Sequence, residues 1–204
     1  MNITAIILAA GMSSRMSRHK LTAEINGIPI IRRAAEAVSQ SDIDEIIVVT
    51  GYMDSDVCAA LEGLAYSNVF NARYESGMGS SIAAGASFLA NHSVGAVMIC
   101  HGDMPFIRTE TINTLINTYR RSKAGIIVPY YDDKRGHPVL FDAVYLPDLM
   151  ELDGQAGARG IIERYKSVVT AVSVSDPGVL IDIDTDENLA SGQVYYNDII
   201  RKNQ

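Results

Sequence analysis

Cysteine is scarce in this chain of 204 residues, which contains only Cys58 and Cys100. The two lie far apart and show none of the close spacings that are typical of metal sites. We therefore expect two reduced thiols rather than a disulfide framework, as is usual for proteins of the cytoplasm. Neither thiol is expected to act as a nucleophile.

Long hydrophobic runs and an excess of basic charge are also missing. The apolar run near the N-terminus is too short to cross a bilayer, and no basic flank precedes it, so we expect neither a membrane span nor a signal peptide. Lys and Arg number 17 against 24 Asp and Glu, which gives a formal net charge of −7. This balance argues against general affinity for nucleic acid or for anionic membranes. We expect a cytoplasmic protein.

Linkers, internal repeats and low-complexity tracts are absent as well, so we expect a single domain over residues 1–204. Strand-like apolar runs alternate with helix-like patterns along most of the length. This alternation favours an α/β fold with a mostly parallel central sheet flanked by helices. The expected helices include residues 29–39, 54–61 and 109–122, the last of them capped by Thr109.

The most informative stretch that is present lies at the beginning of the chain. The continuous apolar run at residues 3–8 predicts a strand buried on both faces. Residues 9–20 follow it, and ligands of parallel sheets bind beyond the carboxyl ends of the strands. Small residues at 9–11 let a base or a phosphate approach the backbone. The cations that follow are Arg15, Arg18 and Lys20. They would bind an anion, although composition alone leaves a solvated basic turn equally open.

Carboxylates occupy two further places where a ligand is expected. Asp103 follows the apolar run 96–100, at the point where a metal bound to substrate phosphates would need an oxygen ligand. Asp182 and Asp184 alternate within residues 180–185, and a period of two places them on one side of a predicted strand. Both groups have the alternative of capping the turn or helix that follows.

Two loops complete the set of candidates. The glycine-rich loop at residues 77–81 precedes a predicted helix at 82–90, where bare amides would contact an anion or a base. A serine-capped helix after a flexible loop is the alternative. His137 ends a predicted exposed turn at 131–137, and contact with substrate and simple exposure are equally open for it.

Segments along nearly the whole length resemble, in order, motifs of the nucleotidyltransferase family of molybdenum cofactor cytidylyltransferase, whose domains are called MobA-like. These segments are Leu8-Ala9-Ala10-Gly11 with Arg15-Met16 and Lys20, Gly77-Met78-Gly79-Ser80-Ser81, Gly102-Asp103-Met104-Pro105, Gly136-His137-Pro138-Val139-Leu140-Phe141, Gly154-Gln155-Ala156-Gly157-Ala158-Arg159, and Asp182-Ile183-Asp184-Thr185. The resemblance implies a Rossmann-like nucleotidyltransferase fold of the GT-A-like type.

The same resemblance implies a reaction and a set of roles. The family transfers a nucleotidyl group from a nucleoside triphosphate to a phosphorylated acceptor and releases pyrophosphate. Lys20 and Arg15 would then be the catalytic cations on the triphosphate, and Asp103 with Asp184 would hold Mg²⁺. No Ser-His or Cys-His pair is evident, and none is required, because a phosphate acceptor is itself an anionic nucleophile. Positioning and electrostatic stabilisation carry such reactions.

The residues of the first motif indicate which nucleotide the resemblance implies. Leu-Ala-Ala-Gly is typical of the cytidylyl branch and Leu-Ala-Gly-Gly of the guanylyl branch, so CTP is preferred over other NTPs. Molybdopterin is the implied acceptor, contacted by His137, and a molybdenum hydroxylase is the implied partner protein. The implied nucleotide-binding residues are Leu8, Ala9, Ala10, Gly11, Gly79, Ser80 and Ser81.

Three positions depart from the family pattern: Ser17 stands for Gly, Gln155 for Asp, and Asp186 for Pro. They keep two alternatives open. One is transfer to another phosphorylated small molecule, such as a sugar or polyol phosphate. The other is a non-catalytic accessory protein that delivers cofactor to a molybdenum hydroxylase.

Overall fold

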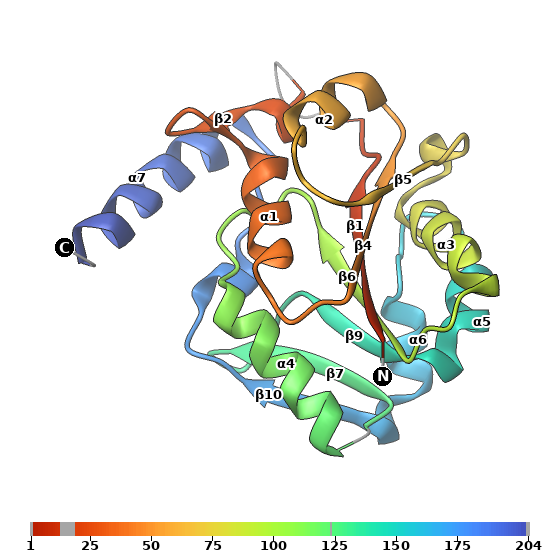
Figure 1. The fold of residues 1–204 in the computed structure, drawn as a ribbon. Helices are drawn as coiled ribbons and strands as arrows, with labels where there is room; N and C mark the ends of the chain where they lie inside the picture. The colour runs from red at the N-terminus through yellow and green to blue at the C-terminus, as the bar shows by residue number, and fades with distance from the viewer. Residues whose placement is uncertain (1, 13–18, 123, 203–204) are drawn as a thin grey trace.

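A computed structural model describes residues 2–12, 19–122 and 124–202 (Figure 1). Within them, eight strands form the main sheet, in the order β10-β7-β9-β6-β1-β4-β5 with β8 paired to β7. The strands are β1 (Ile3–Ala9), β4 (Glu45–Thr50), β5 (Ser67–Phe70), β6 (Ala96–His101), β7 (Ile126–Tyr131), β8 (Lys134–Arg135), β9 (Val139–Asp142) and β10 (Val169–Ser173). A separate hairpin pairs β2 (Glu24–Ile25) with β3 (Ile28–Pro29).

The main sheet is mostly parallel, as the alternating pattern predicts. β1 lies between β4 and β6 and is parallel to both, β4 is parallel to β5, and β7 is parallel to β10. β9 runs antiparallel between β6 and β7, and the short β8 is antiparallel to β7. The register places Leu8 beside His101, so the chain leaves β1 and β6 at the same edge of the sheet. That edge carries the candidate site.

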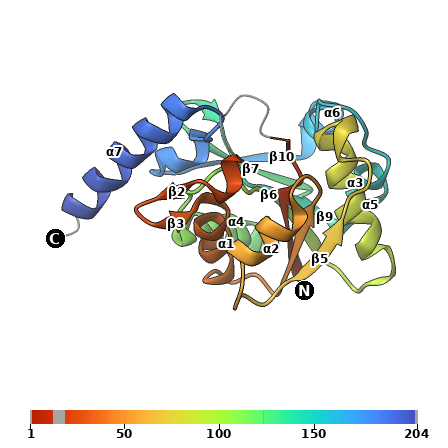
Figure 2. The ribbon, with the colours of Figure 1, turned by 90° about the horizontal axis from the view of Figure 1, so that it is seen from above.

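Helices cover both faces of the sheet (Figure 2). They are α1 (Ile30–Ser39), α2 (Asp54–Ala60) and α4 (Thr109–Ser122) on one face, and α3 (Met78–Phe88), α5 (Leu146–Met150) and α6 (Arg159–Arg164) on the other. Because side chains alternate along a strand, β1 supplies Ile7 to the first core and Ile6 to the second. Both side chains are fully buried. A strand buried on both faces is what its continuous apolar run predicts.

α7 (Asp186–Lys202) lies at the side of the β2–β3 hairpin and extends from the body of the molecule (Figure 1). The guanidinium of Arg33 lies 4.0 Å from the ring centroid of Tyr196, and the Phe106 and Tyr195 rings meet edge to face. No helix of the described residues has the length and apolar character needed to cross a membrane.

The segment that carries Asp184 is not a strand, in contrast to the prediction for residues 180–185. Residues Pro177–Leu180 form a 3₁₀ helix, and the chain then runs irregularly to α7. The side chain of Asp176 accepts a hydrogen bond from the Gly178 amide, which favours the 3₁₀ turn. Beyond it, the Ile183 amide donates to the Asp103 carbonyl. Isolated hydrogen bonds therefore hold this segment, and it forms no strand.

Two helix starts also differ from the prediction. α3 begins at Met78 rather than at residue 82, so Gly79, Ser80 and Ser81 lie in its first turns instead of in a loop. Thr109 is the first residue of α4, and its hydroxyl donates to the carbonyl of Ala37 instead of capping the helix. The hydroxyl joins α4 to α1, a tertiary contact that the local pattern does not contain.

Candidate active site

A cleft opens at the edge where β1 and β6 end, as expected for a parallel sheet. It consists of three adjoining cavities that share Met78, His101 and Gln155. The carboxylate cavity, of about 480 Å³, is lined by Asp103, Asp182 and Asp184 among others. The loop cavity, of about 270 Å³, lies against residues 8–12 and 74–78. The apolar cavity, of about 230 Å³, lies between α3, β9 and α6.

Lys20, Asp103 and Asp184 meet in the carboxylate cavity. The Nζ atom of Lys20 lies 2.5 Å from Oδ2 of Asp103 and 2.7 Å from Oδ1 of Asp184. Lys20 begins a 3₁₀ helix after the first loop, and Asp103 follows β6. The three side chains retain 14%, 17% and 33% of their exposure, so the contact is shielded from bulk water. Burial alone lowers the pKa of Lys20, but the two carboxylates raise it, and the ammonium stays charged.

The cavity can hold a divalent cation with help from a substrate. Among residues 2–12, 19–122 and 124–202, no three His, Cys, Asp or Glu side chains are arranged to hold a metal alone. Magnesium at phosphate sites needs only one or two carboxylates, with water and phosphate oxygens completing its shell. Oδ1 of Asp103 is buried and accepts no hydrogen bond from the described residues. Asp103 and Asp184 therefore fit a metal that arrives with a triphosphate.

Negative charge accumulates beside this pair. Asp182 lines the same cavity, and burial, followed by repulsion from Asp184 and Asp103, raises the pKa of its carboxyl. A carboxyl whose pKa is raised by neighbouring carboxylates gains from any added cation. Asp182 therefore adds negative charge to a cavity in which an added cation would be favoured.

His101 and His137 pack together where the carboxylate and apolar cavities meet. Their ring centroids are 4.1 Å apart, and His137 is not on an exposed turn. Burial, with smaller contributions from His101 and Arg135, lowers the pKa of His137 to about 3. Burial also lowers the pKa of His101, against the opposing pull of Asp103. Both imidazoles are neutral at physiological pH, so they can offer hydrogen bonds but not charge.

The residues predicted to hold the nucleotide separate into two groups. Leu8, Ala10, Gly11 and Ser81 line the loop cavity, next to Lys20 and Asp103. Ala9 instead belongs to the buried core. Its side chain points away from the cavity because neighbours on a strand alternate.

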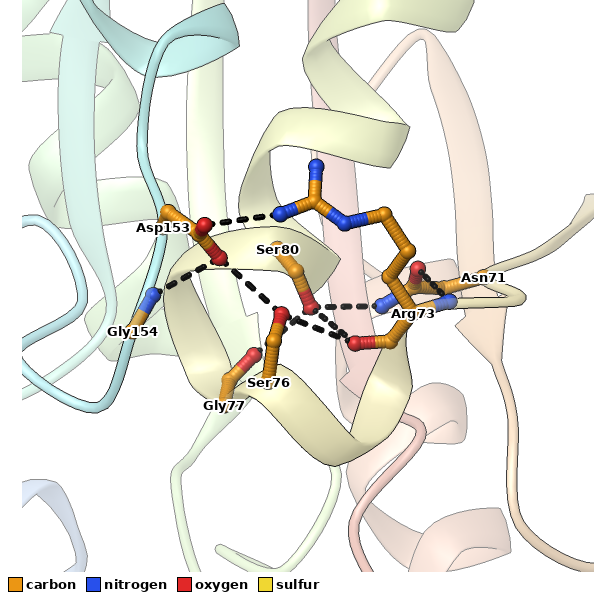
Figure 3. A network of polar contacts seen from close by, with 7 residues as sticks. All are labelled: Asn71, Arg73, Ser76, Gly77, Ser80, Asp153 and Gly154. Carbon is orange, nitrogen blue, oxygen red and sulfur yellow. Dashed lines mark hydrogen bonds and ion pairs between the residues drawn. The ribbon is translucent and has the colours of Figure 1, made fainter.

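Ser80 and Gly79 make contacts within the protein, in the wall of the cleft. The Ser80 hydroxyl lies within hydrogen-bonding distance of the Asn71 amide and of the Arg73 and Gly77 carbonyls (Figure 3). The residue is 5% exposed, so its hydroxyl is committed to the wall. Gly79 donates its amide to the Gly154 carbonyl, and a Cβ at this position would lie 2.5 Å from the Asp153 carbonyl oxygen. Glycine is thus required for close packing here.

A polar junction joins this wall to the segment containing Gln155. Asp153 accepts from Arg73 at 2.7 Å and from the Ser76 hydroxyl at 2.9 Å (Figure 3). The junction fixes the backbone just before Gln155, which together with Met78 lines all three cavities. The geometry gives a positioning role to residues that the sequence pattern indicates only as parts of a loop.

Two of the predicted cations, Arg15 and Arg18, lie outside the described residues. Another arginine of the cleft was not predicted. It is Arg135, which lines both the carboxylate and the apolar cavities, although the sequence pattern places it only in an exposed turn. The signal that would have found it is its position directly before Gly136-His137, a segment already singled out.

Comparisons with known proteins bear on these observations. The family model described as MobA-like NTP transferase domain matches residues 5–168. A relative from Paenarthrobacter nicotinovorans, named nicotine blue oxidoreductase, is 29% identical over 92% of this chain and 94% of its own. A structure titled a nucleotidyl transferase from Methanothermobacter thermautotroptrophicus has a TM-score of 0.83 at 22% identity, covering 97% of this chain and 99% of that one. Rv0371C from Mycobacterium tuberculosis, solved in complex with manganese, has a TM-score of 0.75 at 22% identity, covering 94% and 97%. The predicted fold class is confirmed.

Proposed function

This chain belongs to the family of MobA-like NTP transferase domains and is a nucleotidyltransferase of that type; we propose that it transfers CMP from CTP to molybdopterin and releases pyrophosphate. The observation that carries the proposal is the meeting of Lys20, Asp103 and Asp184 beside the loop cavity. A cation and two carboxylates at one edge of the sheet suit a triphosphate with its divalent ion.

In the proposed reaction, an oxygen of the acceptor phosphate attacks the α-phosphorus of CTP. The bond from that phosphorus to the bridging oxygen of pyrophosphate breaks, and pyrophosphate leaves with the electron pair. Lys20 would bind the triphosphate and offset the charge that grows on the departing group. Asp103 and Asp184 would hold Mg²⁺, which supplies further positive charge to the phosphates.

The neutral histidines agree with this chemistry. The acceptor phosphate is already an anion near neutral pH and needs no general base to become a nucleophile. His101 and His137, whose pKa values burial lowers, can orient the acceptor through hydrogen bonds without adding charge. Positioning of two reactants then accounts for much of the rate enhancement.

The choice of CTP rests on the first motif. Leu8, Ala10 and Gly11 of Leu-Ala-Ala-Gly line the loop cavity, where the base and ribose would lie. The product would be the cytosine dinucleotide form of the cofactor, and a molybdenum hydroxylase would be the protein that receives it. The manganese in the Rv0371C structure is consistent with a divalent ion at this kind of fold.

The test is a turnover assay with Mg²⁺, molybdopterin and each of CTP, GTP, UTP and ATP, read by pyrophosphate release and by the mass of the dinucleotide product. CTP is expected to be used best. Lys20→Ala is expected to lose most activity, whereas Arg32→Ala, which removes an ion pair to Glu36 on α1, keeps it. A preference for GTP would refute the base assignment. Absence of pyrophosphate with every nucleotide would favour the accessory protein instead.

A further inference from the structure

A third core lies beside the β2–β3 hairpin, apart from the two cores on the faces of the main sheet. Its buried members are Ala23, Ile25, Ile30, Phe106, Ile183 and Leu189. The hairpin and its two ends supply the first three, the segment after β6 supplies the fourth, and α7 with the residues before it supplies the last two. None of these side chains lines a cavity of the cleft, so contact with a substrate does not account for the core.

The third core joins the two carboxylates that are proposed as metal ligands. Phe106 lies in the turn after Asp103, and Ile183 directly precedes Asp184. The amide of Ile183 donates to the carbonyl of Asp103 at 2.9 Å, which links the two segments next to the carboxylate cavity. The separation of the two carboxylates is therefore set by the packing of Phe106 and Ile183 as well as by the ion pairs with Lys20.

α7 covers this core and contacts both segments. The rings of Phe106 and Tyr195 meet edge to face, with centroids 5.0 Å apart. At Gly192 the helix comes so close that an added Cβ would lie 3.0 Å from Cζ of Phe106 and 3.1 Å from Cδ1 of Ile183. The buried Leu189 adds a contact one turn earlier in the helix. α7 therefore holds the Phe106 turn and the Ile183 segment against each other.

Polar contacts join α7 to the β2–β3 hairpin, which follows the 3₁₀ turn that begins at Lys20. The backbone amide of Asn26 donates to Oε1 of Gln193 at 3.0 Å, and its side-chain amide donates to Oδ1 of Asn197 at 3.0 Å. The side-chain amide of Gln193 donates in return to Oδ1 of Asn26. One helix thus contacts the segments of all three ionisable side chains that meet in the carboxylate cavity.

We propose that α7 positions Lys20, Asp103 and Asp184 for the reaction, and that Tyr195 is the positioning residue through which it does so. The inference rests on the proposed function and deepens it, because it names a residue outside the cleft on which the nucleotide and metal site depends. A misplacement of about 1 Å, caused by a change far from the reacting atoms, can lower a rate by about 10²-fold. The Tyr195 ring contacts the Phe106 turn directly, so its loss loosens that turn first.

The first test measures amide hydrogen exchange by NMR in the full chain without ligands. Tyr195→Ala removes the ring from Phe106 and is expected to speed exchange of the Ile183 amide by about tenfold or more. Tyr195→Phe keeps the ring and is expected to keep the protection. Exchange of the Ile7 amide, in the middle of the main sheet, is expected to stay the same, which shows that the rest of the fold is intact.

Tyr145→Ala is the matched control, because the Tyr145 and Tyr165 rings form a similar pair with centroids 4.8 Å apart. Tyr145 lies just beyond Asp142, which pairs with Ala96 at the start of β6, so it is at the sheet edge opposite the cleft. This variant is expected to leave the exchange of Ile183 unchanged.

Three results of the exchange measurement would overturn the inference. They are unchanged exchange of Ile183 in Tyr195→Ala, equal acceleration at Ile183 and Ile7, and the same acceleration of Ile183 in Tyr145→Ala. If Tyr195→Ala does not fold, Tyr195→Leu, which loses the ring but keeps an apolar side chain, decides by the same measurement.

The second test separates positioning from a simple loss of stability. Tyr195→Ala is expected to raise the KM for CTP with Mg²⁺ by about tenfold and to leave the KM for the acceptor unchanged. A protein that is only less stable would show a lower apparent kcat, because fewer molecules are folded, and would keep both KM values. A loss confined to kcat therefore overturns the inference. Tyr195→Phe is expected to restore the original KM.

This proposal and the proposed function fail in different ways. If the unmodified protein releases no pyrophosphate but Ile183 responds to Tyr195→Ala as expected, α7 positions the three ionisable side chains and the transferase reaction is wrong. If turnover occurs as proposed but Ile183 does not respond, the transferase stands and positioning by α7 is wrong.

Discussion

The Nζ atom of Lys20 lies 2.5 Å from Oδ2 of Asp103, across 83 positions of sequence, and also contacts Asp184. The ammonium therefore lies between the two carboxylates that are proposed to hold a divalent ion. In the absence of nucleotide, the Lys20 ammonium and a divalent ion would compete for the same two carboxylates. A triphosphate offers Lys20 another anionic partner, so nucleotide and metal should each strengthen the binding of the other.

Replacing Lys20 should separate its effect on turnover from its effect on metal binding. Lys20→Met is expected to lower turnover by about 10²–10³, the usual cost of losing one well-placed electrostatic group. The same change removes the competing cation, so the affinity for Mn²⁺ without nucleotide should rise, as measured by isothermal titration calorimetry. Arg32→Met removes a cation that pairs outside the cleft and should leave Mn²⁺ binding unchanged. Weaker Mn²⁺ binding by Lys20→Met would contradict the competition.

The half-buried His137 should make stability depend on pH. Its pKa is about 3 in the folded protein and about 6.5 in an unfolded chain. The unfolded chain binds more protons between these values, so the free energy of unfolding should fall as the pH falls from about 6.5 toward 3. His101 and Arg135, which face the ring, oppose its protonation in the same sense.

Urea denaturation at pH 7 and pH 5 measures this loss. His137→Gln should lose less stability between the two pH values than the unmodified protein does. His92→Gln, at an exposed histidine that stacks on Phe88, should keep the original pH dependence. An undiminished loss in His137→Gln would assign the effect to other groups.

Much of the fold could be predicted because its strands are buried on both faces. Runs such as residues 46–49 and 96–100 are continuously apolar and are followed by turns, so their limits are local features. Asp103 could be placed at a strand end for the same reason. Its contact with Lys20 could be inferred only from the order of motifs, since nothing local records which strands are neighbours.

Other features depend on contacts between distant segments. The alternation of Asp182 and Asp184 is typical of a strand, but the anchored turn before them keeps the chain from joining the sheet. The hydroxyl of Ser80 was expected to meet a nucleotide, yet the Asn71 amide and nearby carbonyls take up its hydrogen bonds. Its partners cannot be read from a Gly-Ser pattern. The burial of His137 follows in the same way from its packing against His101.

Asp176 should control the position of the segment that leads to Asp184. It is 2% exposed and accepts from the Thr111 hydroxyl at 2.7 Å and from the Gly178 amide at 3.0 Å. Asp176→Ala leaves these two donors without their acceptor, at a cost of about 2–6 kcal/mol from about 1–3 kcal/mol each. Urea denaturation should show this loss. Asp42→Ala, at an exposed aspartate 3.8 Å from Arg120, should change stability by less than about 1 kcal/mol. Equal losses in the two variants would contradict the anchoring role.

Gly79 tests whether the polar junction positions Gln155. Alanine is favoured over glycine within a helix by about 1 kcal/mol, so Gly79→Ala would stabilise α3 if space were available. The new Cβ would instead lie 2.5 Å from the Asp153 carbonyl oxygen, and the backbone before Gln155 would have to move. We expect a loss of about 1–3 kcal/mol in urea denaturation, as is typical of overpacking. KM for the acceptor should rise because Gln155 lines all three cavities.

The matched control for this prediction is Gly160 in α6, where an added Cβ would meet no other part of the described chain within 4 Å. Gly160→Ala should be neutral or stabilising by about 0.4–1 kcal/mol, because it restricts only the unfolded chain. A stabilised Gly79→Ala protein with unchanged KM would mean that the junction yields freely, and the positioning role of Asp153 would be wrong. If Gly79→Ala is destabilised but its KM is unchanged, the close packing at residue 79 is supported and its proposed effect on Gln155 is wrong.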